Sequence, residues 1–213
     1  LANFLLALVI FFSIYTFIGK DFTPAVINEV QKNSPAMTGG LKQDDIILEI
    51  DGNEVQSILD VSKFITISTD EYIDFKIKRS YSEILLKIKP DMVLTEDSLG
   101  NTINKRMVGI KLGAYNNKIN HIKLGPAQAI LHAVHEVYFV SVSSLKYIGA
   151  MIIGKADTSQ LGGPIRIAKI SGQVADIGLL AFISMMAYIS ISLGLVNLFP
   201  IPMLDGGHLM FYA

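Results

Sequence analysis

The chain contains no cysteine, and that absence excludes a disulfide framework as well as any metal site built from thiolates. A bound metal would therefore need histidine and carboxylate ligands. Charged residues are also few, at 17% of the chain. The 18 basic and 19 acidic residues nearly cancel to a net charge of −1, which gives no sign of a nucleic-acid partner. Apolar side chains are plentiful instead, at 51% of the 213 residues with a mean hydropathy of +0.45. These values are high for a soluble chain.

Two long stretches carry no charged side chain, residues 1–19 and residues 177–196. A helix of about 20 apolar residues is needed to cross the hydrocarbon core, so both are predicted to be transmembrane helices. A signal peptide explains residues 1–19 less well, because the basic start is lacking and the run exceeds the ~7–15 residues of a signal core. Charged residues concentrate between the two stretches. The sequence thus predicts an α-helical polytopic membrane protein with an inserted α+β domain.

The second stretch continues into Asn197–His208, a segment with one carboxylate, two prolines and a glycine pair. Asp205 would lie near membrane depth, where a carboxylate costs roughly 2.5–3.5 kcal/mol and is by default a functional candidate. Pro200 and Pro202 lack backbone N–H groups and bias the preceding residues toward extended backbone, so the helix should break here. Broken backbone at this depth is tolerated where it lines an internal polar site. The alternative is a turn that ends the helix, with Asp205 as a solvated cap residue.

This segment resembles the Asn-x-x-Pro-x-Pro-x-Leu-Asp-Gly motif of the site-2 protease family, the intramembrane zinc metalloproteases. The resemblance implies that Asp205 is a ligand of a catalytic Zn²⁺. It also implies a catalytic role for Asn197, which would contact the substrate backbone near the metal. The matching positions are Asn197, Pro200, Pro202, Leu204, Asp205 and Gly206.

One part of that family's metal site is missing from the 213 residues. The family takes its other two ligands and its general base from an HExxH helix, and no HExxH occurs here. The nearest string starts at His135 and has Phe139 where the second histidine would stand. His132 and His135 are interpreted as polar residues on the wet face of an amphipathic helix, and His208 as a polar residue of the next helix. We expect the missing ligands upstream of Leu1.

Residues 24–113 have the character of a soluble, β-rich domain. Helix-like spacing predicts a helix over Ser57–Ile67, and alternating residues on both sides of Arg79–Ser82 predict a hairpin. Residues 26–55 resemble a PDZ domain of the circularly permuted type found in bacterial membrane-associated proteases. Asp44 stands where that family usually has glycine, which predicts that the turn before the next strand is either strained or re-routed. The matching strings are Ser34-Pro35-Ala36, Gly40-Leu41, Asp45-x-Ile47 and Ile50-x-Gly52.

The PDZ resemblance also implies a peptide-binding groove. PDZ domains bind an extended peptide as an added strand, and in the permuted form the groove strand comes late in the domain. We assign it to Met107–Leu112, facing the predicted helix, with Val108, Gly109 and Ile110 as substrate-binding residues and a peptide C-terminus as the ligand. An ordinary strand that closes the sheet is an equally good interpretation of Met107–Leu112. The domain can also act through its size alone, without a bound peptide.

Residues 125–174 are ambiguous, because apolar residues dominate while histidines and charges interrupt them. Suppose that the chain leaves the depth of the active site along residues 1–19 and returns to it along residues 177–196. The number of membrane crossings between these two stretches must then be even. We therefore predict interfacial amphipathic helices over 125–154 and 164–172, with a buried transmembrane helix as the alternative for 125–154. Residues 177–213 then hold the last predicted helix and the zinc-ligand motif.

The site-2 resemblance covers nearly the whole chain and implies a membrane-embedded zinc metalloprotease. Its expected function is regulated intramembrane proteolysis of single-span membrane regulators such as anti-sigma factors. The expected location is the bacterial inner membrane, in contact with lipid, with the PDZ domain on the extracytoplasmic side. Two other classes stay open, a catalytically inactive PDZ scaffold and a transporter or channel. The transporter class predicts an inverted repeat, and residues 1–19 and 177–196 share only their hydrophobicity.

Overall fold

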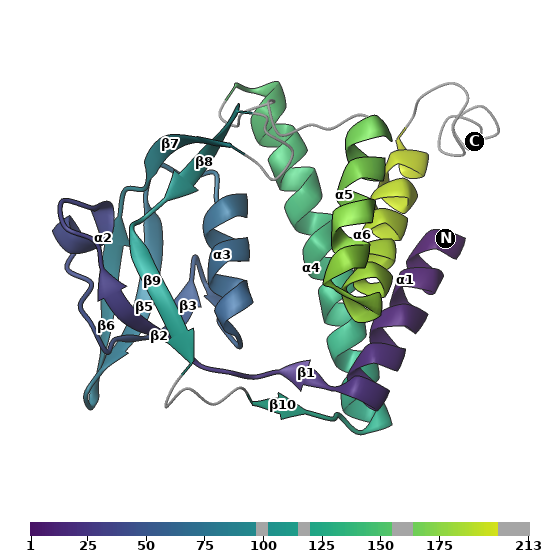
Figure 1. Ribbon diagram of the computed structural model, residues 1–213, viewed down its shortest axis with the longest axis horizontal. Coiled ribbons are helices and arrows are strands. Elements are labelled where there is room, and N and C mark those ends of the chain that lie inside the picture. The colour runs from purple at the N-terminus through teal and green to yellow at the C-terminus, as the bar shows by residue number, and fades with distance from the viewer. Residues whose placement is uncertain (97–101, 115–119, 155–163, 200–213) are drawn as a thin grey trace. The chain divides into compact units, whose positions relative to one another are not determined.

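The computed structural model describes residues 1–96, 102–114, 120–154 and 164–199 and consists of two compact units (Figure 1). The first unit comprises Leu1–Lys20, Lys123–Ile152 and Leu161–Ala213 and is helical in its described part. The second comprises Asp21–Ile122 and Ile153–Gln160 and is built on a β-sheet. In chain order, the β unit is therefore inserted between two helices of the helical unit.

The helical unit consists of α1, a π-helical extension η1 and three further helices. Helix α1 packs against both α4 and α6, and α5 packs against α6. Small residues occupy much of these contacts, since Ala7, Ala133 and Ala187 are completely buried. Small side chains allow the backbones of neighbouring helices to approach closely. The elements are α1 (Ala2–Ser13), η1 (Ile14–Ile18), α4 (Pro126–Ile152), α5 (Pro164–Ile177) and α6 (Leu179–Leu198).

Among the described residues, one helix is long and apolar enough to cross a membrane, namely α6 with 20 residues and a mean hydropathy of 2.2. The helix over Ala2–Ile18 is apolar but shorter. The polytopic membrane protein therefore stays a prediction, as does the interfacial placement of residues 125–174. Helix α6 begins later than expected because Gly178, with a φ of 140°, separates it from α5. Ile177 consequently belongs to α5, which runs five residues beyond the predicted end at Gly172.

The β unit contains a six-stranded antiparallel sheet with the order β6-β5-β3-β2-β9, in which β4 also pairs with β3. Two further pairs, β1 with β10 and β7 with β8, lie outside this sheet. Among the described residues, β9 is an edge strand of the sheet and pairs only with β2. The strands are β1 (Lys20–Asp21), β2 (Ala25–Val30), β3 (Ile46–Ile50), β4 (Asn53–Glu54), β5 (Ile73–Arg79), β6 (Ser82–Ile88), β7 (Asp91–Glu96), β8 (Thr102–Met107), β9 (Ile110–Ala114) and β10 (His121–Ile122).

Local sequence signals place the two helices of this unit, α2 (Pro35–Thr38) and α3 (Ile58–Ile67). Ser57 caps α3 by accepting the N–H of Asp60, whose carboxylate in turn accepts the N–H of Ser57. Val61 and Phe64 are buried, and α3 contacts β2, β3, β8 and β9. The predicted helix and the predicted hairpin, β5 with β6, are both confirmed. Asp44 has a φ of 68°, so of the two alternatives for that turn the structure has the strained backbone.

The predicted groove strand over Met107–Leu112 is wrong as one continuous strand. Strand β8 ends at Met107 and β9 begins at Ile110. Between them Gly109 has a φ of 80°, a left-handed conformation that interrupts the pleated backbone. The interruption redirects the chain from the β7–β8 pair into the main sheet.

Candidate functional site

The C-terminal end of α6 carries the first residue of the proline motif. Asn197 lies in the last turn of the helix and is half-buried. The helix ends at Leu198, and Phe199 has a ψ of 141°, which is the extended backbone expected before a proline. The predicted helix break is therefore confirmed at its first residue. Pro200, Pro202, Asp205 and Gly206 lie outside the described residues.

Close contacts with α1 fix the position of the helix that carries Asn197. The Ser190 hydroxyl donates a 2.8 Å hydrogen bond to the carbonyl of Asn3. At Gly194, an added Cβ would lie 2.9 Å from the Phe4 ring. A glycine at this point lets the aromatic ring lie directly on the α6 backbone. These contacts hold α6 against α1 near the end where the motif begins.

The histidines of α4 take part in packing and polar contacts. The side chains of Lys20 and His132 are in hydrogen-bond contact, with 3.3 Å between Nζ and Nδ1, and the His132 ring lies edge-on to Tyr15. His135 is exposed. In the part of the chain that the structure describes, no three His, Asp or Glu side chains are grouped to hold a metal ion. The described histidines therefore do not assemble a metal centre.

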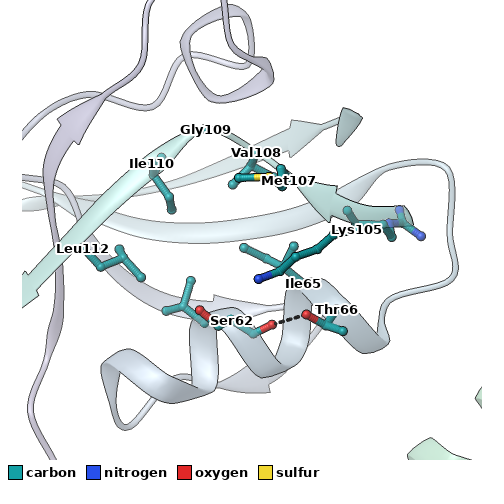
Figure 2. A pocket seen from close by; sticks show the side chains of 11 residues that line it. Ser62, Ile65, Thr66, Lys105, Met107, Val108, Gly109, Ile110 and Leu112 are labelled. Carbon is teal, nitrogen blue, oxygen red and sulfur yellow. Dashed lines mark hydrogen bonds between the residues drawn. The ribbon is translucent and has the colours of Figure 1, made fainter. Parts of the chain in front are cut away.

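The residues predicted to bind a peptide do come together in the β unit. Val108, Gly109 and Ile110 line a pocket with a volume of about 110 Å³, and α3 forms its opposite wall (Figure 2). Sites for drug-sized ligands measure roughly 300–1,000 Å³, so this pocket matches single side chains of a longer ligand. Its full lining is Val61, Ser62, Ile65, Thr66, Lys105, Arg106, Met107, Val108, Gly109, Ile110 and Leu112.

The backbone between β8 and β9 presents hydrogen-bond donors on one side. The carbonyls of Val108 and Gly109 accept the N–H groups of Ala36 and Gln31, at 2.8 Å and 2.9 Å. In a trans peptide the C=O and the following N–H point in opposite directions, and no described peptide bond is cis. The N–H groups of Gly109 and Ile110 therefore point away from these partners. Two successive N–H groups directed to one side form an anion-binding concavity.

The open edge of β9 offers further backbone groups. Val30 and Ile110 are paired in the β2–β9 ladder, with the bond from Gln31 to Gly109 next to them. In an antiparallel ladder this spacing makes Val30–Ile110 a pair without mutual hydrogen bonds, so the N–H and C=O of Ile110 face away from β2. An edge of this kind can accept an added strand.

Two pocket residues, Lys105 and Arg106, were missed by the sequence reasoning. They directly precede the apolar run Met107–Ile110, and that adjacency was a usable signal. Arg106 donates through Nη1 to the carbonyl of Ser68 at 2.6 Å and through Nη2 to the carbonyl of Asp70. Burial lowers the pKa of Arg106, while the charges of Asp51 and Asp70 raise it. An arginine remains a cation throughout.

Comparison with known proteins decides the family. The model of Peptidase family M50 matches residues 1–213. The chain belongs to Peptidase family M50. The site-2 protease resemblance of the sequence is thereby confirmed at the level of the family.

Relatives in family M50 share about a third of their residues with the chain. A protein of Agrobacterium fabrum, named as a candidate zinc metalloprotease, is 37% identical over 213 residues, which are 100% of the chain and 56% of that protein. A Rickettsia conorii protein with the same kind of name is 35% identical over 211 residues, covering 99% of the chain and 59% of that protein. The chain thus spans a little over half the length of these relatives.

PDZ domains are among the solved structures that resemble the family M50 chain. The PDZ domain of an SdrC-like protein from Listeria monocytogenes has a TM-score of 0.35 and 23% identity, covering 43% of the chain and 88% of that domain. The HtrA3 PDZ domain bound to the phage-derived ligand FGRWV has a TM-score of 0.28 and 20% identity. It covers 34% of the chain and 86% of that domain.

Proposed function

We propose that the chain is part of a membrane-embedded zinc metalloprotease that cleaves single-span membrane proteins such as anti-sigma factors. The observation that carries the proposal is the end of α6. The apolar helix that is long enough to cross a membrane stops at Leu198, two residues before Pro200 and the segment that contains Asp205. Membership in family M50 supports a peptidase, and the motif supports its placement inside a membrane.

Asp205 is proposed as one ligand of Zn²⁺. A carboxylate is a suitable donor for zinc, but a catalytic zinc needs three protein ligands, and the 213 residues contain no HExxH to supply the others. The remaining two histidines are therefore proposed to come from outside these residues. A zinc ion in such a site activates a bound water for attack on a carbonyl.

Asn197 is proposed to hold the substrate. A membrane-spanning substrate helix must unwind before cleavage, because its carbonyls are hydrogen-bonded within the helix. The Asn197 amide has both a donor and an acceptor and stands one residue before the end of α6, where it could pair with unwound substrate backbone.

The β unit is proposed to be a PDZ-type module on the extracytoplasmic side of the bacterial inner membrane. Support comes from the edge strand β9, the helix α3 across the pocket, and the donor pair of Gly109 and Ile110. Together these features suit an extended peptide that ends at the β8–β9 junction. Strand addition would provide affinity, and the pocket would select the side chain.

The direct test is cleavage by the full-length protein reconstituted in lipid vesicles. The substrate is a single-span membrane protein whose outer domain has been removed. Wild type should cleave it, and Asp205→Asn should abolish cleavage because an amide oxygen is a far poorer zinc ligand than a carboxylate. Undiminished cleavage by Asp205→Asn would overturn the assignment. A wild-type protein that binds peptide but never cleaves would instead be the inactive scaffold.

A further inference from the structure

Strand β6 forms the edge of the main sheet at the end opposite to β9, and among the described residues it pairs only with β5. Three alternate residues of β6 are exposed, namely Glu83, Leu85 and Lys87. Leu85 exposes 76% of its surface although it lies in the middle of the strand. An edge strand with an exposed apolar side chain is a place where a further strand can add.

The backbone groups of the same three residues point away from β5. The N–H and the C=O of Asp74 both bond to Asp51, at 2.8 Å and 2.9 Å, on the side of β5 that faces β3. Asp74 is opposite Lys87 in the β5–β6 ladder, so this pair exchanges no hydrogen bonds, and neither do the pairs of Leu85 and Glu83 farther along. The N–H and C=O groups of Glu83, Leu85 and Lys87 therefore face the open edge of the sheet.

This edge is complementary to itself when two copies of β6 run antiparallel about Leu85. Leu85 then lies opposite Leu85 of the second copy, and Glu83 lies opposite Lys87 of the second copy. Each of these pairs joins outward-facing backbone groups, so each can exchange hydrogen bonds. Opposite charges and apolar side chains directly across from each other stabilise an antiparallel pair. On the other face of the strand, the half-buried side chains of Ile84 and Leu86 become opposite one another.

Other antiparallel registers lack this complementarity. A shift by two residues places Leu85 opposite Glu83 or Lys87, and a shift by four places Glu83 or Lys87 opposite its own copy, which is a like-charge pair. Within the chain Glu83 is paired with Lys76 at 3.2 Å and Lys87 with Asp74 at 3.6 Å. These pairs lie on the exposed face of the sheet, so sharing them with a second copy costs little.

We propose that the β6 edge is a self-association surface, through which two copies of the chain form a closed dimer with Leu85 on the two-fold axis. The inference goes beyond the proposed protease function, because neither the zinc-ligand motif nor the groove takes part. One strand pair is small beside the interfaces of permanent dimers, so the association is reversible. Strand β9 is at the other end of the strand order, so the groove of each copy is intact with or without the pairing.

Single cysteines test the pairing, because the chain contains none of its own. Leu85→Cys in the 213-residue chain, in detergent micelles, is treated with a thiol crosslinker one methylene long. Directly opposite residues have Cα atoms about 5.5 Å apart, within reach of this reagent. Tyr81→Cys is the matched control, because Tyr81 is even more exposed than Leu85. In the proposed dimer the two copies of position 81 are eight residues out of register, or about 26 Å apart.

The yield of crosslinked dimer should be at least about fivefold higher for Leu85→Cys than for Tyr81→Cys, because only position 85 meets its own copy in this register. Equal yields, whether high or low, would overturn the inference, since random collision favours the more exposed thiol.

Charge variants in the Leu85→Cys background test the register. Glu83→Lys and Lys87→Glu each place like charges opposite one another, so each should lower the dimer yield at least about threefold. An equimolar mixture of the two variants has opposite charges at both positions and should recover most of the yield. Lys111→Glu on β9 is the control, because it changes an exposed, ion-paired lysine on the other edge, and its yield should stay within about twofold. Undiminished yields in the single variants, or no recovery in the mixture, would overturn the proposed pairing.

Discussion

At the scale of single residues, Gly109 is constrained in two ways. Its φ of 80° is costly for any residue with a side chain, and a Cβ placed on it would lie 2.4 Å from the Cβ of Ser34. Both constraints follow from the hydrogen bonds that direct the Val108 and Gly109 carbonyls into the unit. The donor pair at the pocket therefore depends on a glycine at this position.

Gly109→Ala should destabilise the β unit far more than Gly52→Ala. Gly52 has a similar φ of 75° but has no other atom within 4 Å of an added Cβ. Gly52→Ala should cost about 1–2 kcal/mol for the backbone conformation alone. At position 109 the overpacking should add about 1–3 kcal/mol. Urea unfolding of the 213-residue chain measures the difference, and equal losses in the two variants would contradict the clash.

Residue-level features were predictable where the interacting groups are close in sequence. The Ser57–Asp60 capping box and the extended backbone at Phe199 both depend on partners within three residues. The hydrogen-bond partners of Arg106 could not be assigned from sequence, because Ser68 and Asp70 stand 38 and 36 residues away. Basic residues are common at strand ends, and no local pattern shows which carbonyls they reach.

At the scale of elements, the sequence predicts periodic segments well and interruptions poorly. The PDZ resemblance assigns Met107–Leu112 to one late groove strand. Its interruption depends on bonds to Gln31 and Ala36, more than 70 residues earlier. Gly178, with a φ of 140°, likewise separates α5 from α6, although residues 177–196 are one uncharged apolar run in the sequence.

Helix packing in the helical unit leads to a prediction for Gly194. Gly194→Leu should weaken the contact between α1 and α6 by about 1–3 kcal/mol, because even its Cβ would lie 2.9 Å from Phe4. Gly149→Leu in α4 is the matched control, since beyond its own stretch of helix backbone nothing lies within 4 Å of an added Cβ there. Both changes replace glycine by leucine inside a helix and raise helix propensity equally. The difference in stability between the two variants therefore reports the packing contact alone. Resistance to SDS unfolding should fall only in Gly194→Leu. A similar loss in both variants would show that the Phe4 contact is unimportant.

At the scale of the whole molecule, the β unit is inserted in the chain between the two apolar segments. This order motivates a filter hypothesis, in which the bulk of the unit admits only substrates whose outer domain has been removed. Deletion of residues 24–113 in the full-length protein should then permit cleavage of an uncut substrate. Ile110→Asp in the groove should leave cleavage of trimmed substrate nearly unchanged, as should the control Lys87→Asp on β6.

Loss of trimmed-substrate cleavage in Ile110→Asp alone would contradict the filter hypothesis. The groove would then be a receptor for the new C-terminus, and peptide binding in it would be required for cleavage. Gly109 is unsuitable for this comparison, because its substitution disturbs the fold as well as the groove.

The zinc content of the purified full-length protein tests the central claim most directly. Wild type should contain about one zinc per chain, and Asp205→Asn should lose most of it, because one of three protein ligands is removed. Asn197→Ala should keep its zinc, since that side chain is assigned to the substrate. The 213-residue chain alone should bind zinc weakly. Stoichiometric, tight zinc in that chain would contradict the account, because histidines within the 213 residues, such as His132, His135 or His208, would then have to be ligands.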